Sequence, residues 1–151
     1  VVAVRSDSDI RTLQDLAGKV VAVQSTTKPE ELFLNAEQNG LPRLRRLYSL
    51  QNRDLLYTTL LKGYADALAA HESAIRQFMK DYSVEYRILD EPLMTARLGV
   101  AFAKDRSDDL PQQLTEVFQE MLADGTVRQI VSRYLDDPGH YLDGLEDSTH
   151  A

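Results

Sequence analysis

The polar stretch Gln24-Ser25-Thr26-Thr27 follows the apolar run 20–23 and precedes Pro29, a residue favoured in the first turn of a helix. A helix start leaves backbone amides unpaired and carries partial positive charge, so it suits a carboxylate, sulfate or phosphate. The alternative is a capping box between Thr27 and Glu30, worth about 1 kcal/mol to the helix. Both interpretations stay open, because one loop can serve both purposes.

A second polar pair, His71 and Glu72, follows the strand-like run 66–70. Together the pair could contact a polar ligand, with Glu72 facing a cation or His71 donating to an acceptor. The alternative is that Glu72 only favours the first turn of its helix and that His71 is a surface residue.

Catalytic and metal-binding patterns are scarce in the sequence. There is no cysteine, and the three histidines are His71, His140 and His150. No Walker A loop, dinucleotide-binding glycine motif, zinc-protease motif or nucleophile elbow is present. The sequence therefore predicts no catalytic residue, no metal site and no cofactor.

The elements that must position these residues alternate between strand and helix. Glycines or cap residues punctuate them, with Gly18, Gly40 and Gly63 as helix ends and Asn52 as a helix start. Expected strands are 1–5, 20–23, 44–50, 66–70, 84–89 and 98–103, and expected helices are 12–16, 29–39, 53–62 and 72–80. This alternation predicts a parallel α/β sheet whose ligands bind at the carboxyl ends of the strands. Segments 24–28 and 70–72 would lie at that edge.

Two expectations concern side chains of these helices. Thr12 and Asp15 are spaced as a capping box. The helix after Asn52 is expected to bury Leu55, Leu56 and Leu60.

The last third of the chain is helical. Apolar residues recur at helical spacing from Leu110 to Leu122 and from Val127 to Leu135, and Asp124-Gly125-Thr126 separates the two helices. The polar residues after Asp137 predict a short docked or frayed tail.

Composition excludes several classes of partner. The 151 residues carry a formal charge of −7, which argues against binding nucleic acid or an anionic membrane. The basic cluster at Arg43, Arg45 and Arg46 is interpreted as a solvated edge. Because Val1 already lies in a strand-like run, we expect the chain to be part of a longer protein.

Three runs in order resemble a known family: "IRTLQDLAGKVVAVQSTT", "LLKGYADALAAH" and "LGVAFAKDRSDDLPQQLTEVFQEMLADGTVRQIVSRYL". They are similar to type 2 periplasmic solute-binding proteins, and most similar to the extracellular family 3 group that serves polar amino-acid ABC transporters. The resemblance implies the second lobe and the C-terminal helices of a two-lobed fold, without the N-terminal half of the first lobe. The implied layout is a hinge-crossing strand at 1–5, an α/β ligand-binding lobe at 6–97, a return hinge strand at 98–103, C-terminal helices of the first lobe at 104–136 and a polar tail at 137–151.

The resemblance also implies a function and a site. The chain would be an extracytoplasmic or periplasmic module that binds a small polar or anionic solute, such as an amino acid, and serves an ABC permease. Gln24 and Ser25–Thr27 would hold an anionic group, and His71 and Glu72 would contact the other end. The sequence departs from amino-acid binders twice, since Ser25 stands where a glycine is usual and His71 where an aspartate grips the ligand ammonium. In the family, the C-terminal helices pack on the first lobe. Because most of that lobe is absent from this sequence, we expect the apolar face of these helices to be covered in a homodimer or a segment-swapped dimer.

Three other interpretations remain open on the same fold. The first is a ligand-sensing domain of a histidine kinase or cyclic-nucleotide enzyme, for which a transmembrane helix after Ala151 would argue. The second is an enzyme, such as a dehydratase or a cell-wall lytic enzyme, for which a buried His71–Glu72 pair would argue. The third is the effector domain of a cytoplasmic regulator, marked by a DNA-binding domain before Val1.

Overall fold

The computed structural model describes residues 1–96, 99–105, 108–142 and 145. The chain divides into two compact units, Val1–Ala96 and Arg97–Ala151, and each is described by itself. No helix among the described residues is long and apolar enough to cross a membrane.

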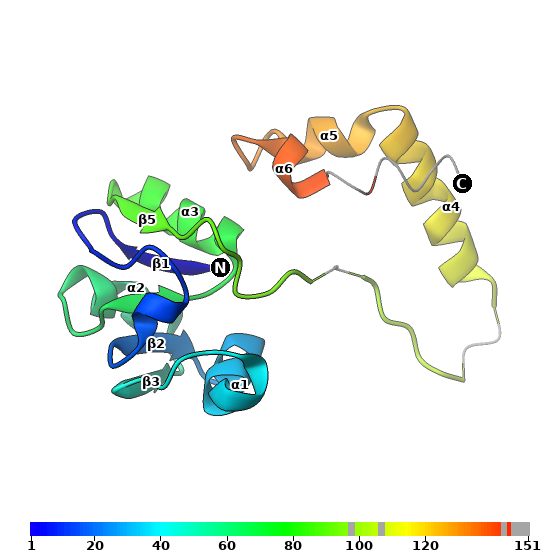
Figure 1. Ribbon diagram of the computed structural model, residues 1–151. Helices are drawn as coiled ribbons and strands as arrows, with labels where there is room; N and C mark the ends of the chain where they lie inside the picture. Colours follow the sequence, from blue (N-terminus) through cyan, green and yellow to red (C-terminus); the bar gives the residue numbers. More distant parts are fainter. Residues whose placement is uncertain (97–98, 106–107, 143–144, 146–151) are drawn as a thin grey trace. The chain divides into compact units, whose positions relative to one another are not determined.

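The first unit is a five-stranded sheet with helices (Figure 1). Its elements in chain order are β1 Val2–Arg5, η1 Gln14–Leu16, β2 Val20–Gln24, α1 Lys28–Leu34, η2 Ala36–Asn39, β3 Arg46–Leu50, α2 Arg53–Leu61, β4 Ala67–Ala69, α3 Glu72–Tyr82 and β5 Tyr86–Ile88. The strand order is β3-β2-β4-β1-β5. β2 runs parallel to β3 and β4, as the alternation of strand and helix predicts, whereas β1 runs antiparallel to β4 and β5. The sheet is therefore mixed.

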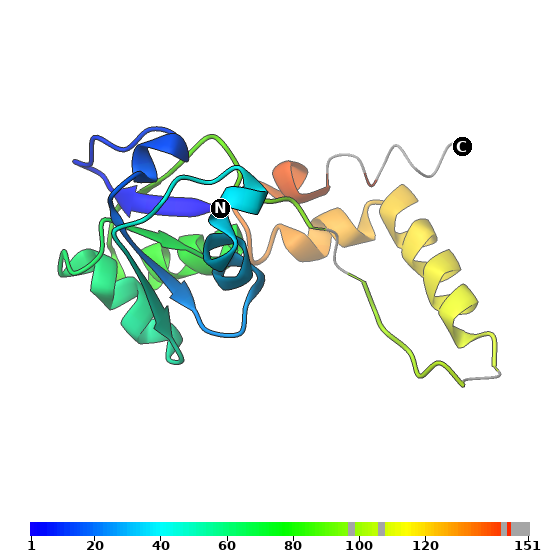
Figure 2. The ribbon, with the colours of Figure 1, turned by 60° about the horizontal axis from the view of Figure 1, so that its bottom comes forward.

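Both faces of the sheet are covered, which explains the continuous apolar strands (Figure 2). Because side chains alternate along a strand, Val21 and Val23 face one side and Val20 and Ala22 face the other. Phe33 of α1 packs on the first side. Residues of α2 and α3, among them Leu56, Leu60, Ile75 and Phe78, pack on the second side.

Predicted side-chain hydrogen bonds form at the start of α2 and just before η1. The Asn52 side chain accepts hydrogen bonds from the amides of Asp54 and Leu55, at 2.8 and 3.2 Å, and so begins α2 as predicted. The predicted capping box is also confirmed, since the Thr12 amide donates to the Asp15 carboxylate at 2.9 Å and the Asp15 amide donates to the Thr12 hydroxyl at 3.4 Å. Amide hydrogen bonds from Arg11 and Thr12 lower the pKa of Asp15.

Two predictions for the helices of this unit are wrong in detail. The helix predicted over 29–39 is interrupted at Asn35, where φ is −109° and ψ is 40°. The side-chain amide of Asn35 donates to the Glu31 carbonyl at 2.9 Å, and such local bonds compete with a continuous helix. Leu55 was expected in the core but is 55% exposed, because the buried face of α2 carries Leu56, Tyr57 and Leu60 instead.

The second unit holds α4 Leu110–Ala123, α5 Thr126–Val131 and α6 Pro138–Leu142. The predicted break is confirmed: Gly125 has φ of 80°, which favours glycine, and the Thr126 amide donates to the Asp124 carboxylate at 2.8 Å. α5 ends at Val131, earlier than the apolar pattern suggests.

The strand predicted over 98–103 is not found in its described part, residues 99–103. Residue 98 lies outside the described residues. A strand needs a neighbour to pair with its backbone, and none of the five described strands pairs with this segment. In the predicted tail, α6 contains His140, whereas His150 lies outside the described residues.

Candidate functional site

Two polar loops leave the sheet side by side at the carboxyl edge of its parallel strands. β2 and β4 are neighbours, and Val23 lies opposite Ala69, so Gln24–Thr27 and Ala70–Glu72 begin at the same level. β3 ends there as well, since Gln24 lies opposite Leu50. The carboxyl edge is where ligands bind in open α/β sheets.

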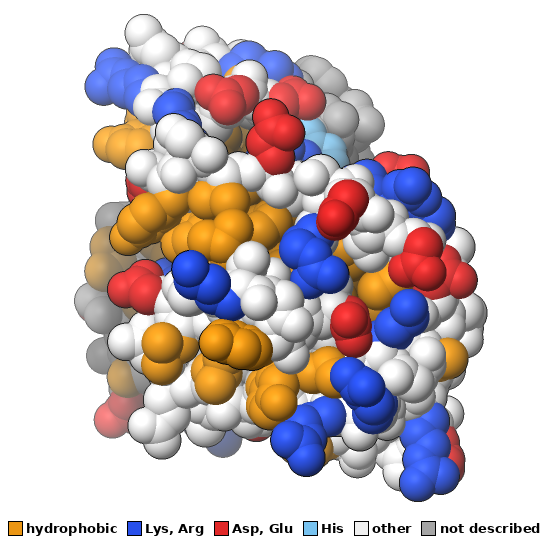
Figure 3. Space-filling model, turned by 90° about the vertical axis from the view of Figure 1, so that its left-hand side faces the viewer, with side chains coloured by type: hydrophobic (Ala, Val, Ile, Leu, Met, Phe, Trp, Pro, Cys, Tyr) orange, Lys and Arg blue, Asp and Glu red, His pale blue; other side chains and the backbone are white. Residues whose placement is uncertain are grey.

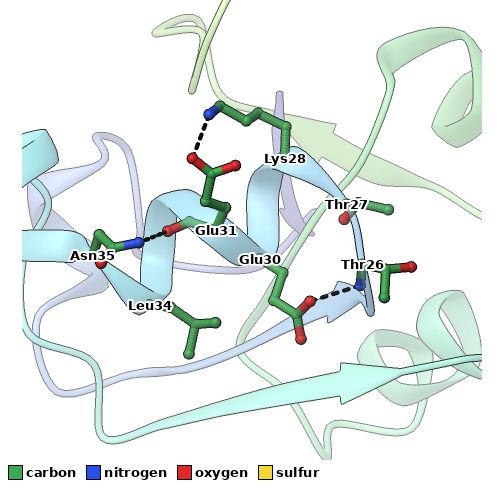
Figure 4. A pocket seen from close by; sticks show the side chains of 7 residues that line it. All are labelled: Thr26, Thr27, Lys28, Glu30, Glu31, Leu34 and Asn35. Carbon is green, nitrogen blue, oxygen red and sulfur yellow. Dashed lines mark hydrogen bonds and ion pairs between the residues drawn. The ribbon is translucent and has the colours of Figure 1, made fainter.

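The loop after β2 is held by its own hydrogen bonds (Figure 4). Thr26 has φ of 60°, an uncommon conformation for a β-branched residue. Its amide donates to the Glu30 carboxylate at 2.6 Å, and its hydroxyl donates to the Ser25 carbonyl at 2.6 Å. The Thr27 hydroxyl donates to the Gln24 carbonyl at 2.5 Å.

The capping box expected between Thr27 and Glu30 is therefore wrong. The Thr27 side chain makes no capping hydrogen bond, because its hydroxyl is turned back to Gln24. Glu30 reaches the amide of Thr26 instead. Hydrogen bonds from the Ser49 side chain and from the Thr26 amide lower the pKa of Glu30.

An open pocket of about 340 Å³ lies beside this loop. It is lined by Thr26, Thr27, Lys28, Glu30, Glu31, Leu34 and Asn35 (Figure 4). Lys28 and Glu31 form an ion pair at 2.5 Å. Thr26 and Thr27 are the two predicted site residues that line the pocket, whereas Gln24, Ser25, His71 and Glu72 do not line it.

His71 and Glu72 differ in their surroundings. His71 is exposed and begins α3, and its carbonyl accepts hydrogen bonds from Ala74 and Ile75, both at 3.1 Å. The Glu72 side chain is 15% exposed, accepts a hydrogen bond from Arg76 Nε at 2.7 Å and forms an ion pair with Arg76 Nη2 at 2.6 Å. The sequence interpretation did not include Arg76, although the four-residue spacing from Glu72 signals such a pair on a helix.

Charged side chains of both signs lie on the surface of the described residues (Figure 3). In the described ranges, no group of three or more histidine, aspartate or glutamate residues could hold a metal ion. Arg43, Arg45 and Arg46 are exposed in or beside the edge strand β3, as predicted. On the face drawn in Figure 3, basic side chains are interspersed with acidic and hydrophobic ones.

Known proteins resemble this chain over most of its length. A family model described as "ABC transporter, phosphonate, periplasmic substrate-binding protein" matches residues 1–138. The histidine-binding periplasmic protein of Escherichia coli K12 is 34% identical over 142 residues, which cover 88% of this chain and 53% of that protein. The chain spans about half the length of the curated relatives it matches.

Solved structures give the same result for the fold. The "probable amino-acid ABC transporter extracellular-binding protein" of Bacillus subtilis superposes with a TM-score of 0.76 at 25% identity, covering 90% of this chain and 59% of that one. The substrate-binding protein of an amino-acid ABC transporter superposes with a TM-score of 0.67 at 27% identity, covering 90% and 58%.

These comparisons confirm the predicted α/β lobe of a type 2 periplasmic-binding-protein fold, and with it the periplasmic or extracytoplasmic location. A family match over residues 1–138 covers most of the sequence and includes both polar loops. The chain belongs to the family of periplasmic substrate-binding proteins of ABC transporters.

Proposed function

We propose that this chain is the second lobe, with the C-terminal helices, of a two-lobed protein that binds a small polar solute for an ABC transporter. An amino acid is the proposed class of solute, and the names of the histidine-binding and amino-acid-binding relatives support it. The observation that carries the proposal is the meeting of two polar loops at the carboxyl edge of neighbouring parallel strands.

The proposed contacts come from both loops. Gln24, Ser25, Thr26 and Thr27 would line one side of the solute with backbone groups and hydroxyls. His71 would contact the other side, because its imidazole is exposed at the same edge of the sheet. Glu72 would act together with Arg76, which already binds its carboxylate.

The proposed activity is binding without catalysis. The relatives are named as binding proteins, and this supports the proposal. The exposed position of His71 also supports it, because the enzyme interpretation calls for a buried His71–Glu72 pair.

The proposed layout follows the family resemblance. Residues 1–5 and 98–103 would cross between the lobes, 6–97 would form the binding lobe, 104–136 would belong to the first lobe and 137–151 would form the tail. The division of the structure between Ala96 and Arg97 supports this layout.

Two partners are proposed, one for the whole protein and one for the 151-residue chain by itself. One is the ABC permease, which would receive the solute after the lobes close. The other is a second copy of this chain, in a homodimer or segment-swapped dimer formed when the first lobe is missing. The exposure of Leu114, Val117 and Phe118 on α4, at 41 to 49%, supports the second partner, and light scattering of the 151-residue chain would test it.

The test of the function is a thermal-shift screen of the full-length protein that carries this chain. The panel contains histidine, arginine, glutamine, cystine, methylphosphonate, phosphate and sulfate. A ligand that binds only the folded state at a hundredfold excess over its Kd adds about 2.7 kcal/mol of stability. We expect a clear shift with at least one amino acid. A folded protein that responds to none of these compounds would contradict solute binding.

His71→Ala tests the proposed contact surface. We expect at least about tenfold weaker binding of the amino acid found in the screen, because one hydrogen bond to a charged or polar ligand group is lost. Stability without ligand should stay unchanged, since the side chain is exposed. Lys62→Ala is the control, because Lys62 is exposed and lies between α2 and β4, before the amino end of that strand. If His71→Ala and Lys62→Ala bind the amino acid with the same Kd, His71 does not contact the ligand.

A further inference from the structure

One side-chain amide joins η2 to the end of α1. The helix α1 ends at Leu34, and a helix end leaves carbonyl oxygens of its last turn without helical donors. The Asn39 side chain donates from Nδ2 to the Leu32 carbonyl at 3.1 Å and to the Asn35 carbonyl at 2.8 Å. The two short helices are therefore held together through the side chain of Asn39.

The residue after Asn39 is Gly40, and both residues are exposed. Glycine has no Cβ atom, so no side chain hinders the approach of the Gly40 backbone nitrogen to the Asn39 side chain. The Gly40 amide donates to the Glu37 carbonyl at 3.4 Å, which is longer than usual for such a bond. Because η2 has only four residues, opening of a single turn would release this nitrogen.

We propose that Asn39 is a site of spontaneous deamidation. The Gly40 backbone nitrogen loses its proton and attacks Cγ of Asn39. A bond forms between this nitrogen and Cγ, the bond between Cγ and Nδ2 breaks, and ammonia leaves with a proton that replaces the one lost by Gly40. The cyclic imide is then opened by water at either of its carbonyl groups, which gives aspartate or isoaspartate at this position.

The fold controls how fast this reaction occurs. In the closed turn, Nδ2 of Asn39 is held against the Leu32 and Asn35 carbonyls, so the reaction requires local opening. Gln14 of η1 holds the same turn from outside, because its Nε2 atom donates to the Gly40 carbonyl at 3.0 Å. Loss of the Gln14 side chain should therefore make opening, and with it deamidation, faster.

The reaction also changes the junction that it modifies. A carboxylate cannot donate a hydrogen bond, so the Leu32 and Asn35 carbonyls lose the donor that Asn39 supplies. The new negative charge lies at the carboxyl end of a helix, where it is unfavourable. Deamidation is thus expected to loosen the end of α1.

The experiment follows deamidation of the folded full-length protein in mildly alkaline buffer. Peptide mapping by mass spectrometry detects the gain of one mass unit at each asparagine, and chromatography separates the isoaspartate product. The sequence has three asparagines, and Asn35 and Asn52 are the internal controls because Ala36 and Arg53 follow them. Gln14→Ala tests the control by the turn. Lys62→Ala is its matched control, because Lys62 is exposed and lies between α2 and β4.

We expect Asn39 to react at least about tenfold faster than Asn35 and Asn52, because a Cβ hinders attack at the other two sites. Gln14→Ala should raise the rate at Asn39 about two- to tenfold, as the loss of one hydrogen bond allows, and Lys62→Ala should leave it unchanged. Asn39→Asp, which reproduces one product, should melt about 2–4 °C below the unsubstituted protein.

A rate at Asn39 no higher than at the other two asparagines would overturn the proposal. This comparison uses the unsubstituted protein, so poor folding of a variant does not affect it. An unchanged rate in Gln14→Ala would overturn the control by the turn, and an unchanged melting temperature in Asn39→Asp would overturn the effect on α1. The inference goes beyond the proposed function, and its test requires no ligand, so each can fail without the other.

Discussion

The buried hydroxyl of Tyr86 should make the unfolding free energy depend on pH in the alkaline range. The Tyr86 side chain is 6% exposed, and its hydroxyl donates to the Tyr57 carbonyl at 2.9 Å. Its ring lies parallel to that of Phe78, with centroids 6.2 Å apart. Burial, together with the nearby Tyr57 hydroxyl, raises the pKa of Tyr86 to about 12. Tyr86→Phe removes the hydroxyl and keeps the ring.

The expected cost of Tyr86→Phe at neutral pH is about 1 kcal/mol of unfolding free energy, which is typical of one lost hydrogen bond. The cost stays low because the Tyr57 carbonyl lies inside α2, where carbonyls accept from the amide four residues later. This carbonyl therefore keeps a hydrogen-bond partner when the Tyr86 hydroxyl is removed. At high pH the sign changes. Because the folded pKa is raised, protonated Tyr86 contributes stability that is present below pH 10 and lost as the pH rises toward 12. This loss is at most about 2.7 kcal/mol and, allowing for solvent near the ring edge, about 1–2 kcal/mol.

Urea unfolding followed by circular dichroism between pH 7 and 11.5 measures both effects. Every other titrating group is common to the two proteins, so the difference between them isolates Tyr86. We expect Tyr86→Phe to be less stable up to about pH 9, with a difference that shrinks above pH 10 and reverses near pH 11.5. Tyr64→Phe, at a side chain that is 70% exposed, is the control and should leave the profile unchanged. Parallel profiles for Tyr86→Phe and the unsubstituted protein would refute the reasoning.

Substitutions at three further positions test the core and the caps. Leu68→Ala, at a side chain with no exposure in the sheet, should lower the unfolding free energy by about 2–5 kcal/mol in urea titrations, and a loss below 1 kcal/mol would contradict its place in the core. Asn52→Ala should cost about 1 kcal/mol, because two amides of α2 lose their acceptor, whereas Asn52→Asp should restore most of it. Asp15→Asn should weaken the dependence of the unfolding free energy on pH below about pH 4. The lowered pKa of Asp15 gives stability that is present above about pH 4 and lost at lower pH. An unchanged dependence in this pH range would argue against the Asp15 contacts.

The sequence predicts the elements of the first unit well where local signals agree with burial. Asn52 caps α2 and Thr12 and Asp15 form their reciprocal hydrogen bonds as expected, because these interactions need only a few neighbouring residues. The run 20–23 is buried on both faces, as a continuous apolar strand in a parallel sheet should be. The antiparallel direction of β1 does not follow from its own residues, because its pairing depends on residues far along the chain.

The sequence predicts where the two polar loops lie in the fold, but it does not predict the hydrogen bonds within them. The loops at 24–27 and 70–72 follow from the alternation of strands and helices, which brings the carboxyl ends of parallel strands to one edge. The hydrogen bond from Thr26 to Glu30 depends on a positive φ at Thr26. Threonine gives no signal for that conformation, whereas glycine or asparagine would.

The place of β1 in the sheet has a consequence for synthesis of the chain. β1 lies between β4 and β5, and its ladder partners are residues 67–69 and 86–88. It is therefore made roughly several seconds before its neighbours, at ordinary translation rates. During that time its apolar residues, including Val2 and Val4, have no strand to pair with. The sheet of the first unit can therefore close only after residues 86–88 have been made.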